Sequence, residues 1–347
     1  MGKLKEVSAF TLFLIFCFFI ISCATNQGKS KTAESSTMLP AVKALTLKTT
    51  IGLPKVKGGF DLMATDVKGQ RLFLSAEDNH SLEVIDLKAG KPLQSIPGFN
   101  EPKWVVYRPE SNRIYVSTGG DGKVTVLDGA SYKPVKSFSF KEKCNNLRYD
   151  TATRQLFVGV GNTFGSIGII DVTKDKIETE ISLSDFPKQF ELDEKLIYVN
   201  IPSKNCIDVV DRKVGKVVAS WPVTQSNQNV PMAFDQIHKR LFIACEPGKF
   251  IVYAVETGKP LTDFTINKNA DGIYYDAKRS LIYVSCAEGY IDVIKQKDAD
   301  HYEMIDKMTT AKGAGTSLYS PMLDQLFLAV PESENQPAQL RVYEPNK

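Results

Sequence analysis

The chain of 347 residues is 43% hydrophobic and 24% charged, an ordinary globular composition that excludes a largely disordered protein. A formal net charge of +3 gives no basic surface of the size that nucleic-acid binding needs, so we expect no nucleic acid among its partners. The sequence has only three histidines and no Cys-x-x-Cys pair, which excludes the common zinc and haem motifs.

Residues 1–22 are predicted to be a signal peptide. Lys3 and Lys5 precede an apolar run that is shorter than the roughly 20 residues of a membrane-spanning helix. The run ends in Ile20-Ile21-Ser22-Cys23, which resembles the lipobox of bacterial lipoproteins. The resemblance implies cleavage before Cys23 and attachment to a membrane through its acylated sulfur. Because Ala24 replaces the Asp of the inner-membrane retention signal, we expect an outer-membrane lipoprotein facing the periplasm or the cell surface. An uncleaved signal anchor is the alternative.

Residues 23–40 are predicted to form a flexible tether, since Thr25 to Ser36 contain almost nothing apolar. Residues 41–347 are predicted to be one domain, because an internal repeat fills this part of the chain. The domain begins with a predicted strand, Ala41 to Leu53, which ends in the β-branched residues Thr49, Thr50 and Ile51.

A short apolar motif, Arg113-Ile-Tyr-Val-Ser117, recurs through the rest of the chain. Seven near-copies align on one aromatic residue at intervals of 41 to 44 residues: Phe73, Tyr115, Phe157, Tyr198, Phe242, Tyr283 and Phe327. A period of this length is typical of propellers and solenoids, in which each repeat is one small structural unit.

Each repeat is predicted to hold four short strands with turn residues between them. In the second repeat these strands are Lys103–Arg108, Arg113–Thr118, Lys123–Asp128 and Pro134–Ser139. Sheets with two apolar faces must stack on their neighbours, which predicts an all-β, seven-bladed β-propeller. The last repeat lacks a fourth strand, whereas Ala41 to Leu53 is a fourth strand without the other three. We therefore expect the N-terminal strand to complete the last blade and close the ring.

The segment Arg113-Ile-Tyr-Val-Ser-Thr-Gly-Gly-Asp-Gly-Lys-Val-Thr-Val-Leu-Asp128 resembles the YVTN-type β-propeller repeat. The Gly-His and Trp-Asp signatures of the WD40 class are absent. The resemblance implies an exported propeller, a class whose members serve in binding, in surface structure or, more distantly, in catalysis.

The repeats differ most at one position near the start of the first strand, which lines the central channel of a propeller. This position holds Asp61, Lys103, Asn145, Lys188, Val230, Asp271 and Gly315 in turn. We expect its five polar residues to face one another at the channel mouth and to bind a ligand or partner, with Trp104 as an aromatic anchor. A water-filled channel with mutually satisfied ion pairs is the alternative.

Two other patterns favour structure over chemistry. An acid ends the third strand in most repeats. It precedes a turn, where its carboxylate can accept hydrogen bonds from backbone N–H groups. Cys245 and Cys286 occupy equivalent positions in adjacent repeats, where either a disulfide or two small core residues would fit.

No catalytic residue, metal ligand or cofactor motif is identified, since no phosphate loop, nucleophile elbow or dinucleotide fingerprint occurs. The interpretation is a non-enzymatic, lipid-anchored binding or scaffold protein whose partner is an envelope protein or a small polar ligand. The alternatives are a metal- or cofactor-dependent exported enzyme, lactonase-like or quinoprotein-like, and a purely architectural envelope protein.

Overall fold

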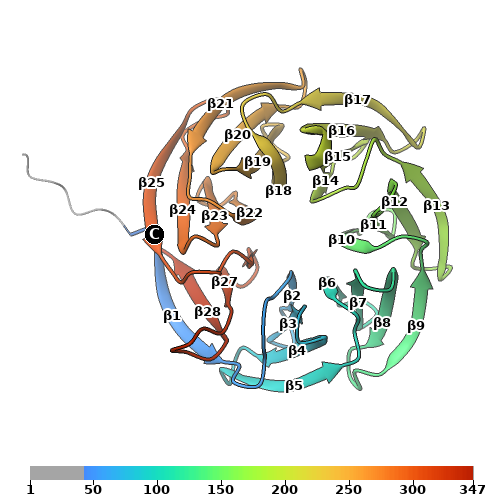
Figure 1. Cartoon of the computed structure of the whole chain (residues 1–347), viewed down its shortest axis with the longest axis vertical. Helices are drawn as coiled ribbons and strands as arrows, with labels where there is room; N and C mark the ends of the chain where they lie inside the picture. The colour runs from blue at the N-terminus through green and yellow to red at the C-terminus, as the bar shows by residue number, and fades with distance from the viewer. Residues whose placement is uncertain (1–42, 347) are drawn as a thin grey trace, which may run out of the picture. The chain divides into compact units, whose positions relative to one another are not determined.

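The computed structural model describes residues 43–346, which form seven four-stranded antiparallel sheets arranged as a ring (Figure 1). The predicted all-β, seven-bladed β-propeller is confirmed. The predicted signal peptide 1–22, Cys23 and the tether 23–40 lie outside the described residues. Within residues 43–346, no helix is long and apolar enough to cross a membrane.

Each sheet is a blade whose four strands run from the channel to the rim. The innermost strands are β2 (Met63–Asp66), β6 (Pro102–Arg108), β10 (Cys144–Asp150), β14 (Phe190–Leu192), β18 (Asn227–Asp235), β22 (Ala270–Asp276) and β26 (Ser317–Ser320). The second strands are β3 (Arg71–Ala76), β7 (Arg113–Thr118), β11 (Gln155–Gly161), β15 (Leu196–Ile201), β19 (Arg240–Glu246), β23 (Leu281–Cys286) and β27 (Gln325–Val330).

The outer half of each blade is built in the same way. The third strands are β4 (Ser81–Asp86), β8 (Lys123–Asp128), β12 (Gly165–Asp171), β16 (Cys206–Asp211), β20 (Lys249–Ala254), β24 (Tyr290–Gln296) and β28 (Gln339–Pro345). The outermost strands are β5 (Lys91–Pro97), β9 (Pro134–Ser139), β13 (Lys176–Ser182), β17 (Lys216–Pro222), β21 (Lys259–Thr265), β25 (Tyr302–Thr309) and β1 (Leu45–Gly52). One 3-10 turn, η1 (Pro202–Lys204), joins β15 to β16.

The ring closes by pairing the first strand with the last. β1 is antiparallel to β28, with Thr46 opposite Glu344 and Ile51 opposite Leu340, so the last blade is completed from the N-terminal side. The predicted closure is confirmed. Pairing with β1 gives β28 a neighbour on both sides, which removes one exposed sheet edge.

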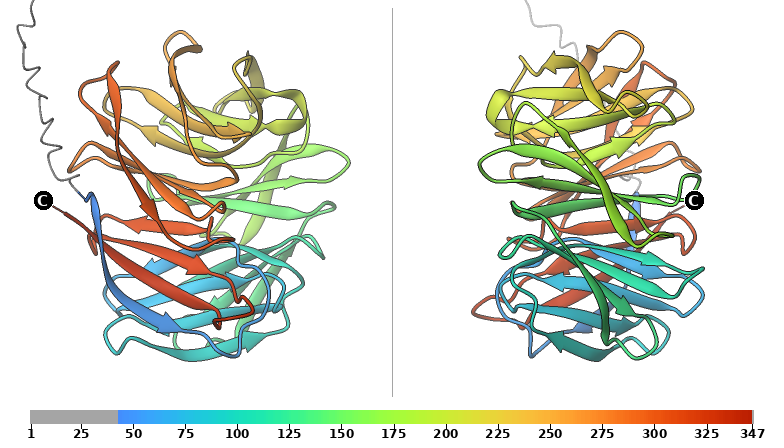
Figure 2. Two further views of the ribbon diagram at one scale, coloured as in Figure 1. Left: turned by 60° about the vertical axis from the view of Figure 1, so that its left-hand side comes forward. Right: turned by 90° about the vertical axis from the view of Figure 1, so that its right-hand side faces the viewer.

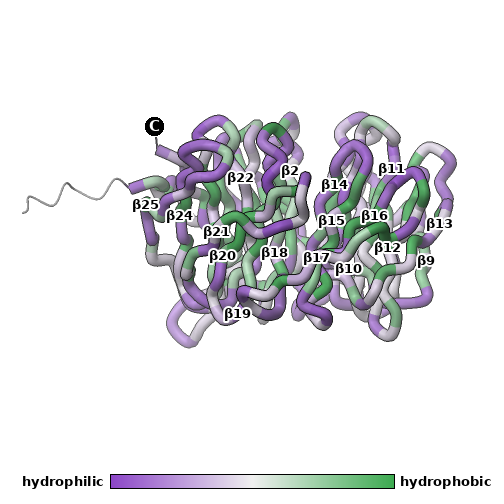
Figure 3. Tube along the Cα trace, turned by 90° about the horizontal axis from the view of Figure 1, so that it is seen from above, coloured by the Kyte–Doolittle hydropathy of each residue, from purple (hydrophilic) through white to green (hydrophobic). Residues whose placement is uncertain are grey.

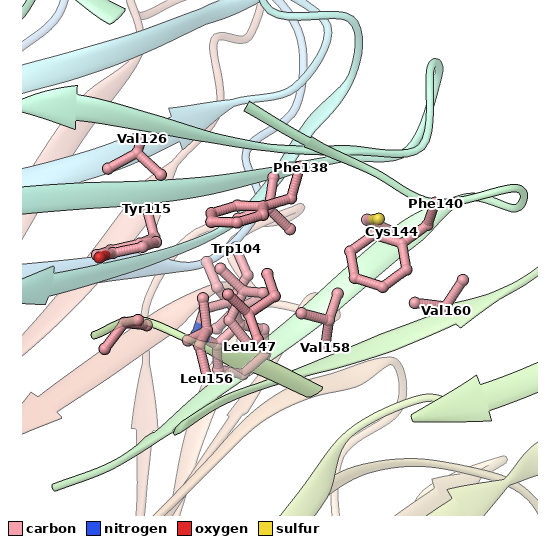
Figure 4. Packing of buried hydrophobic residues seen from close by; sticks show 14 residues of the cluster. Trp104, Tyr115, Val126, Phe138, Phe140, Cys144, Leu147, Leu156, Val158 and Val160 are labelled. Carbon is pink, nitrogen blue, oxygen red and sulfur yellow. The ribbon is translucent and has the colours of Figure 1, made fainter. Parts of the chain in front are cut away.

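Seven apolar clusters hold neighbouring blades together, and each contains one aromatic residue of the repeated motif. All seven aromatic side chains are at most 3% exposed. Figure 4 shows the cluster between the second and third blades, where Tyr115 lies near Val126 and Phe138. The repeat therefore encodes the contact between sheets that stack face to face (Figure 2).

The outermost strands are exposed edges that carry features limiting further pairing. Each has a register shift against its neighbour, such as the one between Val84 and Ile85, and β5, β9, β17 and β21 also contain a proline. Bulges and prolines discourage a second chain from adding to an edge. Hydrophobic residues gather in the strands, and hydrophilic residues gather in the turns (Figure 3).

The acids at the ends of third strands stabilise turns. Backbone N–H groups two or three residues later donate to them at 2.8 to 3.1 Å in the turns of Asp86, Asp128, Asp171 and Asp211. The described cysteines, Cys144, Cys206, Cys245 and Cys286, are all free and buried, so Cys245 and Cys286 are core residues and form no disulfide. Burial raises the pKa of the Cys245 thiol to about 12.

Candidate functional site

The channel mouth, defined here as Asp61, Lys103, Asn145, Lys188 and Asp271, lies at or just before the start of five innermost strands. Figure 1 shows these strands surrounding the centre of the ring. The side chains are partly buried, as expected in a narrow channel. Val230 and Gly315 occupy the same position in the remaining two blades, so these blades contribute no charge to the mouth.

Lys103 joins two neighbouring acids. Its ammonium lies 3.8 Å from Asp61 Oδ2 and donates a hydrogen bond to Glu77, which belongs to the loop between β3 and β4. Burial favours the neutral amine, but the hydrogen bond to Glu77 and the charge of Asp61 raise the pKa of Lys103 overall. Lys103 is therefore a cation whose charge is already balanced by Asp61 and Glu77.

The two carboxylates of the mouth are less well compensated. Burial and the nearby charge of Asp271 raise the pKa of Asp61 well above its ordinary range, and Lys103 offsets this only in part. Burial likewise raises the pKa of Asp271, although Thr316 donates a hydrogen bond of 3.0 Å to it and Lys188 attracts it electrostatically. Both groups would gain from an additional positive charge.

The remaining mouth residues offer donors. Within residues 43–346, the Lys188 ammonium forms no ion pair shorter than 4 Å and lies 5.4 Å from the ring centroid of Phe186. Asn145 is fixed through its backbone carbonyl, which accepts a hydrogen bond from Ser117 Oγ. The structure thus connects Asp61, Lys103, Lys188 and Asp271 electrostatically, whereas Asn145 is bound by Ser117 of the neighbouring blade.

Hydrogen bonds between blades fix the wall of the mouth. Thr316 Oγ1 donates to Asp271 and lies 3.3 Å from the carbonyl oxygen of Phe60 in the first blade. Gln189 spans from the fourth blade to the sixth, since its side-chain amide donates to the carbonyl of Asp271 at 3.0 Å. These contacts hold the acids in place before any ligand arrives, which lowers the entropic cost of binding.

Trp104 lies in the core beside the channel. It is 8% exposed, and the guanidinium carbon of Arg148 lies 4.3 Å from its ring centroid. Arg148 also forms an ion pair of 2.8 Å with Glu191. Trp104 therefore supports Arg148, and the Arg148–Glu191 pair adds charged groups one layer below the mouth that we did not predict from the sequence.

A register shift explains this arrangement. In β6 and β10 the ladder slips between Pro102 and Val105 and between Cys144 and Leu147. Simple alternation would point every second residue into the channel, whereas Arg148 follows the mouth residue Asn145 by three positions. The available signal was Glu191, a charged residue between Phe190 and Leu192 in an otherwise apolar strand.

The mouth combines two carboxylates, two ammonium groups and an amide. No three His, Cys, Asp or Glu side chains of residues 43–346 converge as a possible metal site. No histidine is among the mouth residues, and His238 and His301 pair with Asp235 and Asp298 in turns.

Comparison with known proteins supports the fold alone. No family model and no curated protein matches the chain. A solved structure of hydrazine synthase from Kuenenia stuttgartiensis matches with a TM-score of 0.69 and 16% identity, covering 82% of this chain and 97% of that one. Because 1772 solved chains match, the likeness does not select one activity. The match supports the β-propeller fold of this chain.

Proposed function

We propose that the chain is a lipid-anchored protein of the bacterial cell envelope that binds a small polar ligand in its channel mouth without transforming it. The observation that carries the binding proposal is the pair of partly buried acids, Asp61 and Asp271, whose pKa values are both raised. A cationic group on the ligand would relieve the cost of holding these two carboxylates together.

The other mouth residues complement such a ligand. Lys103 is already neutralised by Asp61 and Glu77, which leaves Lys188 and the Asn145 amide as donors. A ligand that carries an ammonium group and an anionic or carbonyl group would match both halves of the mouth. Small zwitterions such as amino acids have this chemistry.

The binding experiment compares the full chain in detergent with an Asp61→Asn, Asp271→Asn double variant. A panel of amino acids and small diamines is screened by thermal shift, and each binder is quantified by calorimetry. We expect at least one binder whose affinity falls about tenfold or more in the double variant, because charge-assisted hydrogen bonds are lost.

Glu194→Gln is the matched control, since Glu194 is an exposed acid in the turn between β14 and β15, at the opposite end of an innermost strand. It should leave binding unchanged. A panel without any binder, or equal binding by the double variant, would overturn the proposed site. A stoichiometric metal or an absorbing cofactor in protein purified from its host would favour an exported enzyme instead.

The anchoring proposal rests on the lipobox-like sequence that ends at Cys23. Replacing Cys23 with Ala should prevent acylation and cleavage, so the precursor should accumulate and incorporate no labelled palmitate. If Cys23→Ala protein is cleaved at the same place and stays in the membrane, the proposed anchor is wrong.

A further inference from the structure

A buried acid occupies the third residue of the third strand in three blades. These residues are Glu83 in β4, Asp208 in β16 and Asp292 in β24, and they are 3%, 0% and 1% exposed. By strand alternation each lies on the face that contacts the preceding blade. A carboxylate in such a place needs hydrogen-bond donors for both of its oxygens.

In the fourth blade the incoming segment supplies one donor and β17 the other, and in the sixth blade the incoming segment supplies both. The Ser184 amide donates to Asp208 Oδ2 at 2.8 Å, and Ser220 Oγ donates to Oδ1 at 2.5 Å. Asn267 donates its backbone and side-chain N–H groups to the two oxygens of Asp292, each at 2.6 Å. Both acids therefore fix the incoming segment.

In the third blade the equivalent residue is Gly168, and Phe140 of the incoming segment covers it. A Cβ atom on Gly168 would lie only 2.4 Å from the Phe140 ring. The space at this position is thus filled by the chain itself in blades three, four and six.

The first blade differs. Ser81 Oγ and Ser95 Oγ both donate to Glu83 Oε1, at 2.6 and 2.7 Å, and no described residue donates to Oε2. No N–H group of the incoming segment, Leu53 to Val56, donates a hydrogen bond to the carboxylate. Instead a cavity of about 250 Å³ separates this segment from β4 and β5.

The cavity is largely apolar apart from the acid. Its walls include Leu53, Val56, Pro92 and Leu93, with Glu83 reaching it from β4. A cavity of about 150 Å³ is large enough for benzene. The space therefore admits a ring or short alkyl chain together with a polar head group.

We propose that this cavity binds a small primary amine with an apolar body, whose ammonium group donates to Glu83 Oε2. The anionic head excludes carboxylates and phosphates, and the apolar walls favour an aromatic or aliphatic amine over a strongly hydrated metal ion. Lys55 also borders the cavity, is exposed, and competes with the ligand for the charge of Glu83.

The experiment uses phenethylamine and its uncharged analogue 2-phenylethanol with the full chain in nonionic detergent, followed by calorimetry. We expect phenethylamine to bind at least about tenfold more tightly than the alcohol, because only the amine forms a charge-assisted hydrogen bond. Glu83→Gln, which keeps an acceptor for Ser81 and Ser95, should weaken amine binding by a similar factor. Lys55→Gln should strengthen it.

Two matched variants locate the effect. Asp208→Asn removes the equivalent acid from a blade where the chain satisfies it, and should leave phenethylamine binding unchanged. The Asp61→Asn, Asp271→Asn variant should also retain binding, which separates this site from the channel mouth.

Absence of phenethylamine binding, equal binding of both probes, or unchanged binding by Glu83→Gln would overturn the proposal and leave a cavity that holds only water. If Glu83→Gln does not fold, the comparison of the two probes on the unmodified chain, together with Lys55→Gln, decides it.

Discussion

The interfaces between blades and the channel mouth are built from neighbouring strands under different constraints. At the aromatic position of the second strand, all seven blades carry Phe or Tyr and bury it almost completely. At the mouth position of the innermost strand, the blades carry acids, lysines, an amide, Val and Gly. Equivalent positions in a ring have equivalent packing environments, so agreement among the blades marks scaffold and disagreement marks a place where packing does not dictate the residue.

Substitutions in the interfaces between blades should lower the free energy of unfolding more than any other change. Phe242 is fully buried, and its ring centroid lies 5.6 Å from that of Tyr275 in the next blade. Phe242→Ala should lower the free energy of unfolding by about 3–5 kcal/mol through lost burial and a cavity. Urea unfolding monitored by fluorescence measures this.

Phe164→Ala is the control, because Phe164 is 76% exposed and should change stability by less than about 0.5 kcal/mol. Equal effects of the two substitutions would contradict the assignment of the repeated aromatic residues to the interfaces.

The closing strand should behave as scaffold as well. Ile51 of β1 is 1% exposed and packs with residues of the first and last blades. Ile51→Ala should therefore cost about 2–5 kcal/mol in the free energy of unfolding, measured in the same way. Leu47→Ala on the same strand is the control, since Leu47 is 48% exposed. A negligible loss for Ile51→Ala would mean that the ring is stable without its closure.

Strand order, ring closure and the role of the turn acids could be predicted from the sequence because each depends on local patterns. The continuous apolar run of Ile114, Tyr115 and Val116 indicates a strand with two buried faces, and a missing fourth strand requires the N-terminal strand to replace it. The acid before each turn, such as Asp128, needs only the backbone N–H groups that follow it.

The contacts of the site could not be predicted because they join blades. Gln189 crosses from the fourth blade to the sixth, and this depends on how the blades are arranged in space. The stacking of Arg148 on Trp104 depends on register shifts inside β6 and β10, which no local pattern reveals. Likewise, Glu83 resembles Asp208 in sequence, and only the path of the incoming segment leaves an oxygen free.

Substitution of a mouth residue should change the free energy of unfolding in the opposite direction from substitution of a residue in the interfaces between blades. Burial raises the pKa of Asp61 in the folded protein, so the stability contributed by its protonated form is complete below the unfolded pKa, about 3.9, and is lost as pH rises through the folded value. Asp61→Asn mimics the protonated acid. It should stabilise the protein on the order of 1 kcal/mol at pH 7 and have no effect at pH 3.

Asp128→Asn provides a control of opposite sign. Backbone and side-chain hydrogen bonds from Ser131 lower the pKa of Asp128, so its charged form stabilises the fold above the unfolded pKa and this contribution is lost as pH falls. Urea titrations between pH 3 and 7 should show Asp128→Asn as destabilising only at the higher pH values. Destabilisation by Asp61→Asn at pH 7 would mean that Asp61 is part of the scaffold.

The smallest effect is expected at the turn acids, where most blades carry an acid although Asp86, Asp128 and Asp211 are only partly buried. Asp211 accepts two backbone hydrogen bonds of 2.8 Å, from Lys213 and Val214. Asp211→Ala should cost about 0.5–1.5 kcal/mol, the net value of an ordinary hydrogen bond, because water replaces these contacts at the surface. The loss should be the same with and without a chelator of divalent cations. A loss that appears only without the chelator would show that a bound cation, and not turn geometry, explains the repeated acids.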